Sequence, residues 1–205
     1  IILFTSRTNE FQDVIRIAKS LKKELNKPMF CGGIHPTVAP EDAIKYFDGI
    51  CIGEGEEALL ELIENFEKNK DYTKTRGFWF NKDNKIIKNP VPCLVPTLDN
   101  YPFPDREIFD YDKYLKARNY QMDFMTSRGC PFQCTYCVNH TLQQLYKGKG
   151  NYIRTYSIPL VIKELKRLKS KYKIKTIYFL DETFNWNKER LKEFSKAYKK
   201  EINLP

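Results

Sequence analysis

Residues 122–137 read MDFMTSRGCPFQCTYC, a short apolar run that leads directly into three cysteines. Cys130, Cys134 and Cys137 have the spacing C-x3-C-x2-C, so three thiolates on one short loop can converge on a metal centre. A disulfide is a poor explanation, because the number is odd and the close spacing strains the usual Cα separations. Three thiolates leave one iron of a 4Fe-4S cluster without a protein ligand, and that iron is open to chemistry.

His140 offers an alternative, because it extends the motif to C-x3-C-x2-C-x2-H, a zinc-like set of three cysteines and one histidine. Zinc loops usually contribute their ligands as two separated pairs, whereas these four residues lie within 11 positions. A ligand loop directly after a strand is typical of the active-site end of a βα barrel. A structural zinc-binding RNA module remains the alternative from a different class.

The residues that follow continue a pattern of alternating strands and helices. A helix is predicted from residue 157, with Leu160, Val161, Leu165 and Leu168 on its apolar side. A strand over 176–180 and a helix over 188–200 come next. With the strand predicted at 122–127, they give a βαβα order, which favours a parallel sheet.

The first 70 residues show the same α/β pattern. Helices are predicted at 10–25, at 41–47 and from near residue 56 to 66, and strands at 28–31 and 48–52. Each of the two strands is followed by a glycine-bearing loop, GGIHPT at 32–37 and GEGE at 53–56. Glycine permits a bulky ligand to approach the backbone closely, and a helix that begins near Glu56 offers free backbone amides.

The middle of the chain has a different character. Residues 77–80 and 85–88 flank the turn-forming sequence NKDN, which predicts a hairpin. Five prolines fall between Pro90 and Pro104, and they favour extended backbone over helix. We therefore place an interdomain linker here.

The composition of the 205 residues predicts a folded chain, with 41% hydrophobic residues and no apolar run of membrane-spanning length. The net charge of +9 is uneven, because residues 1–100 hold 14 basic and 15 acidic side chains and residues 101–205 hold 21 and 11. Seven basic residues between 163 and 175 are an RNA-facing patch or, as we favour, the solvated face of a helix. The chain begins at Ile1 rather than Met, and we expect it to be part of a longer protein.

The motif and its surroundings resemble the radical SAM enzymes, in which C-x3-C-x2-C follows the first strand of a partial or full βα barrel. Tyr136 occupies the usual aromatic position before the last cysteine, and the lead-in TSRGCP at 126–131 is typical. The resemblance implies that Cys130, Cys134 and Cys137 hold a 4Fe-4S cluster. It also implies that S-adenosylmethionine binds the open iron and is cleaved reductively to a 5′-deoxyadenosyl radical.

The same resemblance implies which side chains contact S-adenosylmethionine. Tyr136 flanks it, and Asp181 or Glu182, at the end of the second barrel strand, orients its amino group. A carboxylate that accepts hydrogen bonds from an ammonium group is suited to that role. Consecutive side chains of a strand point to opposite faces, so we expect only one of the pair to serve, and Glu182 has the longer reach.

The glycine loops, together with LDNYPFPDR at 98–106, resemble the cobalamin-binding subclass of this family. The resemblance implies the C-terminal part of a Rossmann-like cobalamin-binding domain at 1–70, a hairpin and Pro-rich linker at 71–120, and the start of a radical SAM barrel at 121–205. The Asp-x-His-x-x-Gly fingerprint of many cobalamin domains is absent. The cobalamin contacts implied by the loops are Gly32, Gly33, His35, Thr37, Gly53, Glu54, Gly55 and Glu56.

The function implied by these resemblances is a cobalamin-dependent methyltransferase that acts on an unactivated carbon or phosphorus centre. A radical SAM cyclase or rearrangement enzyme and an RNA methylthiotransferase are the enzymatic alternatives. We expect a cytoplasmic enzyme with a small-molecule or peptide substrate and an electron donor such as flavodoxin or ferredoxin. No contact with membrane or nucleic acid is expected, and neither the substrate nor a catalytic side chain can be named from these residues.

Overall fold

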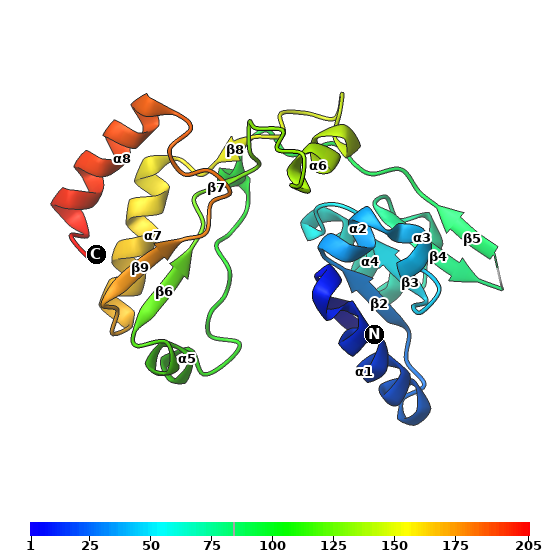
Figure 1. Cartoon of the computed structure of the whole chain (residues 1–205). Helices are drawn as coiled ribbons and strands as arrows, with labels where there is room; N and C mark the ends of the chain where they lie inside the picture. Colours follow the sequence, from blue (N-terminus) through cyan, green and yellow to red (C-terminus); the bar gives the residue numbers. More distant parts are fainter. Residues whose placement is uncertain (84) are drawn as a thin grey trace. The chain divides into compact units, whose positions relative to one another are not determined.

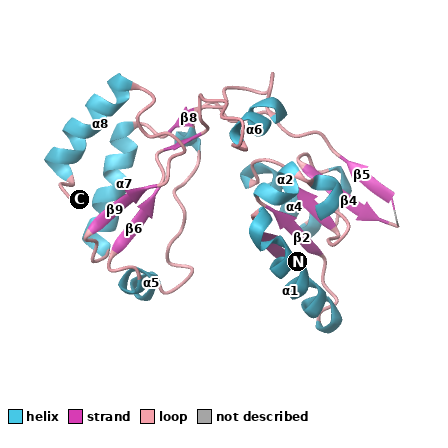
Figure 2. Cartoon of the chain, viewed as in Figure 1, coloured by secondary structure: helices cyan, strands magenta, loops and turns pink. Residues whose placement is uncertain are grey.

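The computed structural model describes residues 1–83 and 85–205, which form two compact units. The first unit combines residues 1–94 with 134–149, and the second combines 95–133 with 150–205. Helices and strands alternate through both units, as Figure 2 shows. Asn84, the last residue of the predicted NKDN turn, lies outside the described residues.

The first unit is built on a five-stranded sheet in the order β1-β2-β3-β4-β5 (Figure 1). The strands are β1 (Ile2–Thr5), β2 (Met29–Gly32), β3 (Gly49–Cys51), β4 (Phe78–Lys82) and β5 (Lys85–Lys88). The first three strands run parallel, whereas β4 is antiparallel to β3 and pairs with β5 as the predicted hairpin. The helices are α1 (Phe11–Glu24), α2 (Ile34–Val38), α3 (Pro40–Ala43), α4 (Glu56–Glu67) and α6 (Asn139–Leu145), with short 3-10 turns at Thr8–Glu10 and Tyr72–Lys74.

Alternation along the central strands sends side chains into two cores, one on each face of this sheet. Met29 and Cys31 of β2 join a cluster with Phe11, Ile15 and Ala18 of α1. Phe30, which lies between them, joins a second cluster whose other buried members are Cys51, Ala58, Leu62, Phe78 and Phe80. Helices α1 and α4 therefore cover opposite faces, because adjacent residues of a strand point to opposite sides. This arrangement confirms the α/β, Rossmann-like prediction for the first part of the chain.

The second unit is built on two pairs of short strands. Strands β6 (Gln121–Phe124) and β9 (Thr176–Phe179) form a parallel pair, and β7 (Ser127–Arg128) pairs antiparallel with β8 (Arg154–Thr155). The helices are α5 (Tyr111–Ala117), α7 (Ile158–Lys171) and α8 (Lys188–Glu201), and a 3-10 turn spans Leu98–Asn100. The strand predicted at 122–127 is thus divided, because β6 ends at Phe124 and β7 begins at Ser127.

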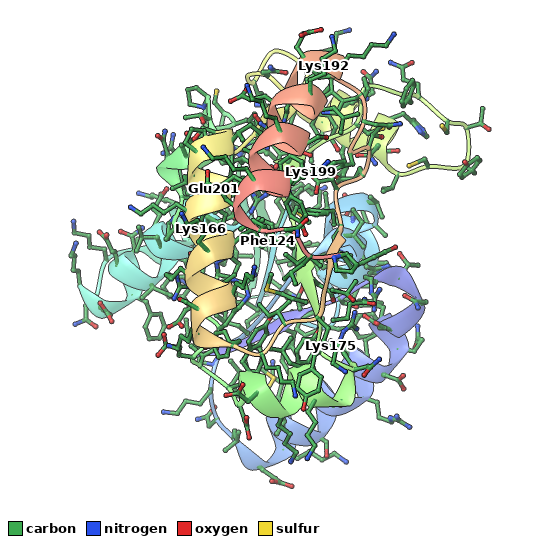
Figure 3. The ribbon with its side chains drawn as sticks, turned by 90° about the vertical axis from the view of Figure 1, so that its left-hand side faces the viewer. Phe124, Lys166, Lys175, Lys192, Lys199 and Glu201 are labelled. Carbon is green, nitrogen blue, oxygen red and sulfur yellow. The ribbon has the colours of Figure 1, made fainter. Side chains whose placement is uncertain are left out.

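Helix α7 connects the two parallel strands and packs on them through a continuous apolar stripe. Its buried hydrophobic residues are Ile158, Val161, Ile162, Leu165 and Leu168. The remaining positions carry the basic run, and in Figure 3 Lys166 of α7 faces Glu201 of α8. The Lys166 Nζ to Glu201 Oε2 distance is 2.8 Å. An exposed pair of this kind contributes about 0.2–1 kcal/mol, so the apolar stripe rather than the charges fixes the helix.

No helix in the part of the chain that the structure describes is long and apolar enough to cross a membrane.

Candidate functional site

The two glycine-bearing loops of the first unit line one cavity of about 330 Å³. Gly32 and Gly33 come from the end of β2, and Gly53 and Gly55 follow β3. The other lining residues are apolar except for Glu56; they are Leu3, Phe4, Phe30, Cys31, Cys51, Leu59 and Phe78. Open α/β sheets bind their ligands outside the carboxyl ends of parallel strands, and this cavity lies at that edge. Its size is at the lower end of the range of small-molecule sites.

Thr37 of α2 ties the two glycine loops together. Its Oγ1 donates to the carbonyl oxygen of Gly33 at 2.8 Å, and it accepts from the backbone N–H of Gly53 at 3.0 Å. Thr37 does not belong to the lining of the cavity. Its hydroxyl therefore holds the two loops at a fixed distance without lining the cavity. The glycine edge of the cavity depends on these two hydrogen bonds.

His35 lies in the core of the first unit rather than on the cavity. The imidazole is buried and stacks on Phe11 with ring centroids 3.8 Å apart. Its Nδ1 is 3.3 Å from Thr8 Oγ1, and its Nε2 is 3.6 Å from the carboxylate of Asp42. These contacts give the side chain a packing role at the start of α2.

Tyr146, which follows α6, fixes the loop after β3. Its hydroxyl accepts a hydrogen bond from the backbone N–H of Glu54 at 2.6 Å, and the side chain is buried. Gly53 has φ +84°, and a Cβ there would collide with this hydroxyl. Leu145 packs against the core on the α1 face of the sheet, so α6 is anchored to the first unit. Sequence reasoning missed Tyr146, because an aromatic residue nine positions after Cys137 carries no recognisable signal.

The three motif cysteines form no disulfides in the described part of the chain, and they differ in exposure. Cys130 is buried, Cys137 is partly buried and Cys134 is exposed. The Sγ of Cys130 lies 3.0 Å from Thr183 Oγ1, and the Sγ of Cys137 accepts from the amide of Asn139 at 3.6 Å. Three cysteine sulfurs are the ligand type of iron–sulfur clusters, and hydrogen bonds to ligand sulfurs are typical around them, so the chemistry of this donor set fits such a cluster.

Over residues 1–83 and 85–205, no group of three or more His, Cys, Asp or Glu side chains is gathered closely enough to hold a metal ion. This applies equally to the zinc alternative. The Nδ1 of His140 is buried without a hydrogen-bond partner, and its Nε2 is 3.5 Å from Thr141 Oγ1. Within the described residues, neither the three thiols alone nor the set with His140 forms such a group.

Asp181 follows β9 and holds the segment that leads to the cysteine loop. Its carboxylate accepts from the backbone N–H of Thr126 at 3.1 Å and from the Thr126 hydroxyl at 2.7 Å. It also accepts from the hydroxyl of Ser127. Arg190 of α8 donates to the carbonyl oxygen of Thr126 at 3.4 Å, and burial lowers the pKa of this guanidinium. Thr126 and Ser127 are both buried, so Asp181 is engaged by the protein itself.

The other two side chains predicted to contact S-adenosylmethionine are open to solvent. Glu182 is exposed, and its carbonyl oxygen accepts from the hydroxyl of Thr183 at 2.8 Å. Tyr136 is 91% exposed. Of the acidic pair, only Glu182 therefore presents a carboxylate without hydrogen bonds to the segment before Cys130. Sequence reasoning gave no role to Thr183 or Arg190, although Thr183 directly follows the acidic pair.

Cys31 and Cys51 lie at the ends of β2 and β3 and carry no obvious chemistry. Burial raises the pKa of the Cys31 thiol to about 12. Burial and the nearby Glu56 raise the pKa of the Cys51 thiol to about 12 as well. A thiol that stays protonated is a poor nucleophile and a poor metal ligand, so both residues act as small apolar side chains lining the cavity.

The fold is α/β, with a five-stranded sheet in the first unit and a parallel strand pair that leads to the cysteine motif in the second. Residues 1–63 match the family model described as the B12 binding domain. An uncharacterised methyltransferase of Pyrococcus horikoshii is 34% identical over 207 residues, covering 98% of this chain and 43% of the relative. Cytidylyl-2-hydroxyethylphosphonate methyltransferase of Streptomyces wedmorensis is 24% identical over 235 residues, covering 99% of this chain and 42% of the relative.

Among solved structures, the cobalamin-dependent S-adenosylmethionine radical enzyme OxsB, with aqua-cobalamin and S-adenosylmethionine bound, has the same fold. The TM-score is 0.73 at 23% identity, over 96% of this chain and 28% of OxsB. The chain thus spans less than half the length of the curated relatives described above. The comparisons confirm the resemblance to cobalamin-binding radical SAM proteins and the fold predicted from it.

Proposed function

We propose that this chain is part of a cobalamin-dependent radical SAM methyltransferase that acts on an unactivated carbon or phosphorus centre. The observation that carries the proposal is the C-x3-C-x2-C loop, placed after the first of two parallel strands in a chain that also matches a B12 binding domain. When bound, the cluster supplies reductive cleavage of S-adenosylmethionine, and methylcobalamin supplies the methyl group. The protein supplies the ligands and the geometry.

Cys130, Cys134 and Cys137 would hold the cluster. All three are free thiols, and the lead-in segment is fixed by the hydrogen bonds of Asp181 to Thr126 and Ser127. Glu182 and Tyr136 would then contact S-adenosylmethionine, because both are exposed. We assign Asp181 to the support of the cysteine segment, and the contact with the amino group of S-adenosylmethionine to Glu182.

Cobalamin would bind at the cavity between the glycine loops. Gly32, Gly33, Gly53 and Gly55 line it, and Glu56 is its acidic lining residue. The cavity is mostly apolar, and the glycines at its edge have no side chains to keep the nucleotide tail of the cofactor away from the backbone. Thr37 and the backbone of Glu54 support the loops, and His35 supports α2 from the core.

The remaining parts of the proposal concern partners and location. Reductive cleavage needs one electron at a time, which flavodoxin or ferredoxin delivers. A cluster with an open iron is labile to oxygen, so we propose a reducing cytoplasmic environment. The substrate would be a small molecule or a peptide. The proposal also places the end of the cobalamin-binding part at residue 70 and the start of the radical SAM part after residue 120.

The test is cofactor analysis of the protein purified at full length without oxygen. We expect about four irons per chain, a cubane EPR signal that changes when S-adenosylmethionine is added, and bound cobalamin in the optical spectrum. Replacement of Cys130, Cys134 or Cys137 with Ala should abolish the cluster, while His140→Ala should retain it. One zinc per chain and no iron would overturn the proposal in favour of the structural zinc module.

The methyl-transfer part is tested separately with S-adenosylmethionine labelled in its methyl group. Label that appears in bound cobalamin supports a methyltransferase. Cleavage of S-adenosylmethionine with no label on cobalamin would favour the cyclase or rearrangement alternative.

A further inference from the structure

Thr183 lies directly against a sulfur that the proposed function assigns to the cluster. Its Oγ1 is 3.0 Å from the Sγ of Cys130, a contact within the second unit. The same hydroxyl lies 2.8 Å from the carbonyl oxygen of Glu182 and donates to it. Cys130 is only 8% exposed, so water has little access to this sulfur.

The position of Thr183 is fixed relative to Cys130 by neighbouring bonds. Asp181, two residues before Thr183, binds the backbone and hydroxyl of Thr126 and the hydroxyl of Ser127. Leu180 N–H donates to the carbonyl oxygen of Phe124 at 2.8 Å. The end of β9 is therefore attached to the segment that leads to Cys130, and the contact between Thr183 and Cys130 follows from this attachment.

A threonine hydroxyl has one hydrogen, and here two acceptors compete for it. A free thiol can donate its own hydrogen to Oγ1 while the hydroxyl donates to the carbonyl oxygen of Glu182. A sulfur bound to iron has no hydrogen and only accepts, so the hydroxyl is then the donor in its contact with Thr183. Turning the hydroxyl toward Cys130 removes its hydrogen bond from the carbonyl oxygen of Glu182.

We propose that Thr183 is a positioning residue that donates a hydrogen bond to the cluster-bound sulfur of Cys130 and thereby raises the reduction potential of the cluster. The proposal rests on the proposed function, because it needs the cluster at this cysteine. A hydrogen bond to a ligand sulfur stabilises negative charge, and the reduced cluster carries more of it. Because the hydroxyl has one hydrogen, donation to Cys130 also changes the hydrogen bonding at the carbonyl oxygen of Glu182, the residue assigned to S-adenosylmethionine.

The experiment compares Thr183→Val, which keeps the shape and removes the hydroxyl, with Thr183→Ser, which keeps the hydroxyl. Thr176→Val, at the other end of β9, is the matched control for loss of a threonine hydroxyl. The full-length protein is reconstituted without oxygen, its iron is counted, and the reduction potential is measured by an EPR-monitored redox titration. We expect the equilibrium constant for reduction of the cluster to be tenfold smaller in Thr183→Val, which corresponds to a reduction potential lower by about 59 mV for one electron. Thr183→Ser and Thr176→Val should keep the parent potential.

The outcomes separate this inference from the function on which it rests. A parent protein without a four-iron cluster overturns the proposed function. A parent cluster with an unchanged potential in Thr183→Val overturns only the role of Thr183. Loss of iron from Thr183→Val, with retention in Thr183→Ser, supports the hydroxyl as a donor. Thr183→Val replaces the hydroxyl by a methyl group, whereas Thr183→Ser keeps the hydroxyl and removes the methyl group. Equal shifts in Thr183→Ser and Thr183→Val would assign the effect to packing and overturn the inference.

Discussion

At the scale of single residues, the adjacent carboxylates Asp181 and Glu182 have different surroundings. Asp181 accepts hydrogen bonds from Thr126 and Ser127, two residues that are buried. Glu182 is exposed. Both residues lie beyond the end of β9 at Phe179, so the hydrogen bonds of Asp181 to Thr126 and Ser127, rather than strand alternation, distinguish the two carboxylates. The sequence pattern alone favoured neither side chain beyond the longer reach of glutamate.

Asp181→Asn should destabilise the second unit, whereas Glu182→Gln should not. An asparagine has one acceptor oxygen and an NH2 group that faces donors, so we expect a loss of about 2 kcal/mol in the free energy of unfolding. Glu182→Gln changes an exposed side chain and should alter it by less than about 0.5 kcal/mol. Urea unfolding followed by circular dichroism measures both values.

The two variants should also differ in binding. On reconstituted full-length protein, Glu182→Gln should weaken S-adenosylmethionine binding in calorimetry with an unchanged iron content. Equal stability of the two variants would contradict the assignment of Asp181 to structural support. Parent affinity and parent cleavage rate in Glu182→Gln would contradict the role proposed for Glu182.

At the scale of elements, α6 has a position that no periodicity indicates. It spans seven residues after the cysteine motif, and Tyr146 behind it binds the backbone of Glu54. Leu94 N–H donates to the carbonyl oxygen of Lys149 at 2.7 Å, which closes the segment onto the first unit. The residues that follow Cys137 are therefore attached to the loop after β3 through the Tyr146 hydroxyl, and the absence of a side chain at Gly53 leaves room for that hydroxyl.

Tyr146→Phe should loosen the loop after β3 without unfolding the unit. Removing the hydroxyl deletes the acceptor of the Glu54 N–H, and a bond worth about 1 kcal/mol corresponds to about fivefold faster exchange of that amide. Hydrogen exchange resolved at single amides measures this change. Tyr178→Phe, which changes a tyrosine that is 55% exposed on β9, is the control and should leave the Glu54 amide at its parent rate. An unchanged rate in Tyr146→Phe would show that packing alone holds the loop.

The elements that the sequence predicted well have long apolar stripes. The helix predicted at 10–25 is α1, Phe11–Glu24, and the helix predicted at 188–200 is α8, Lys188–Glu201. The shorter elements α2, α5 and α6, the two-residue strand β8 and the break between β6 and β7 were not predicted, because such short elements contain too few residues for a period to appear. The glycine loops were predicted as a pair, but the hydroxyl of Thr37 that joins them depends on how α2 folds back.

The prediction of the candidate site was also limited to features that are local in the sequence. The cysteine motif is visible in the sequence, because its spacing is local. The contacts of Thr183 with Cys130 and of Asp181 with Thr126 join residues more than 50 positions apart. They depend on the parallel register of β6 and β9, which pairs Phe124 with Phe179. Alternation of helices and strands predicts that two strands are neighbours, but it does not fix which residues lie opposite each other.

At the scale of the whole molecule, the two units have separate hydrophobic clusters. The second unit is centred on a cluster that includes Leu115, Met122, Val161 and Leu165. The first unit has its own clusters on the two faces of the five-stranded sheet. The buried members of each cluster come from one unit, so each unit has the apolar interior that a folding domain requires.

Leu62→Ala and Leu165→Ala should therefore destabilise different halves of the molecule. Both leucines are fully buried, Leu62 in α4 and Leu165 in α7, and truncation of a buried leucine costs about 2–5 kcal/mol. We expect Leu165→Ala to speed amide exchange in β6 and β9 while β2 and β3 keep their parent rates, and Leu62→Ala to do the reverse. Leu60→Ala removes a leucine of α4 that is 59% exposed and should leave both sheets unchanged. Faster exchange in all four strands with either core variant would mean that the units open together, because local unfolding confined to one core cannot expose the amides of the other.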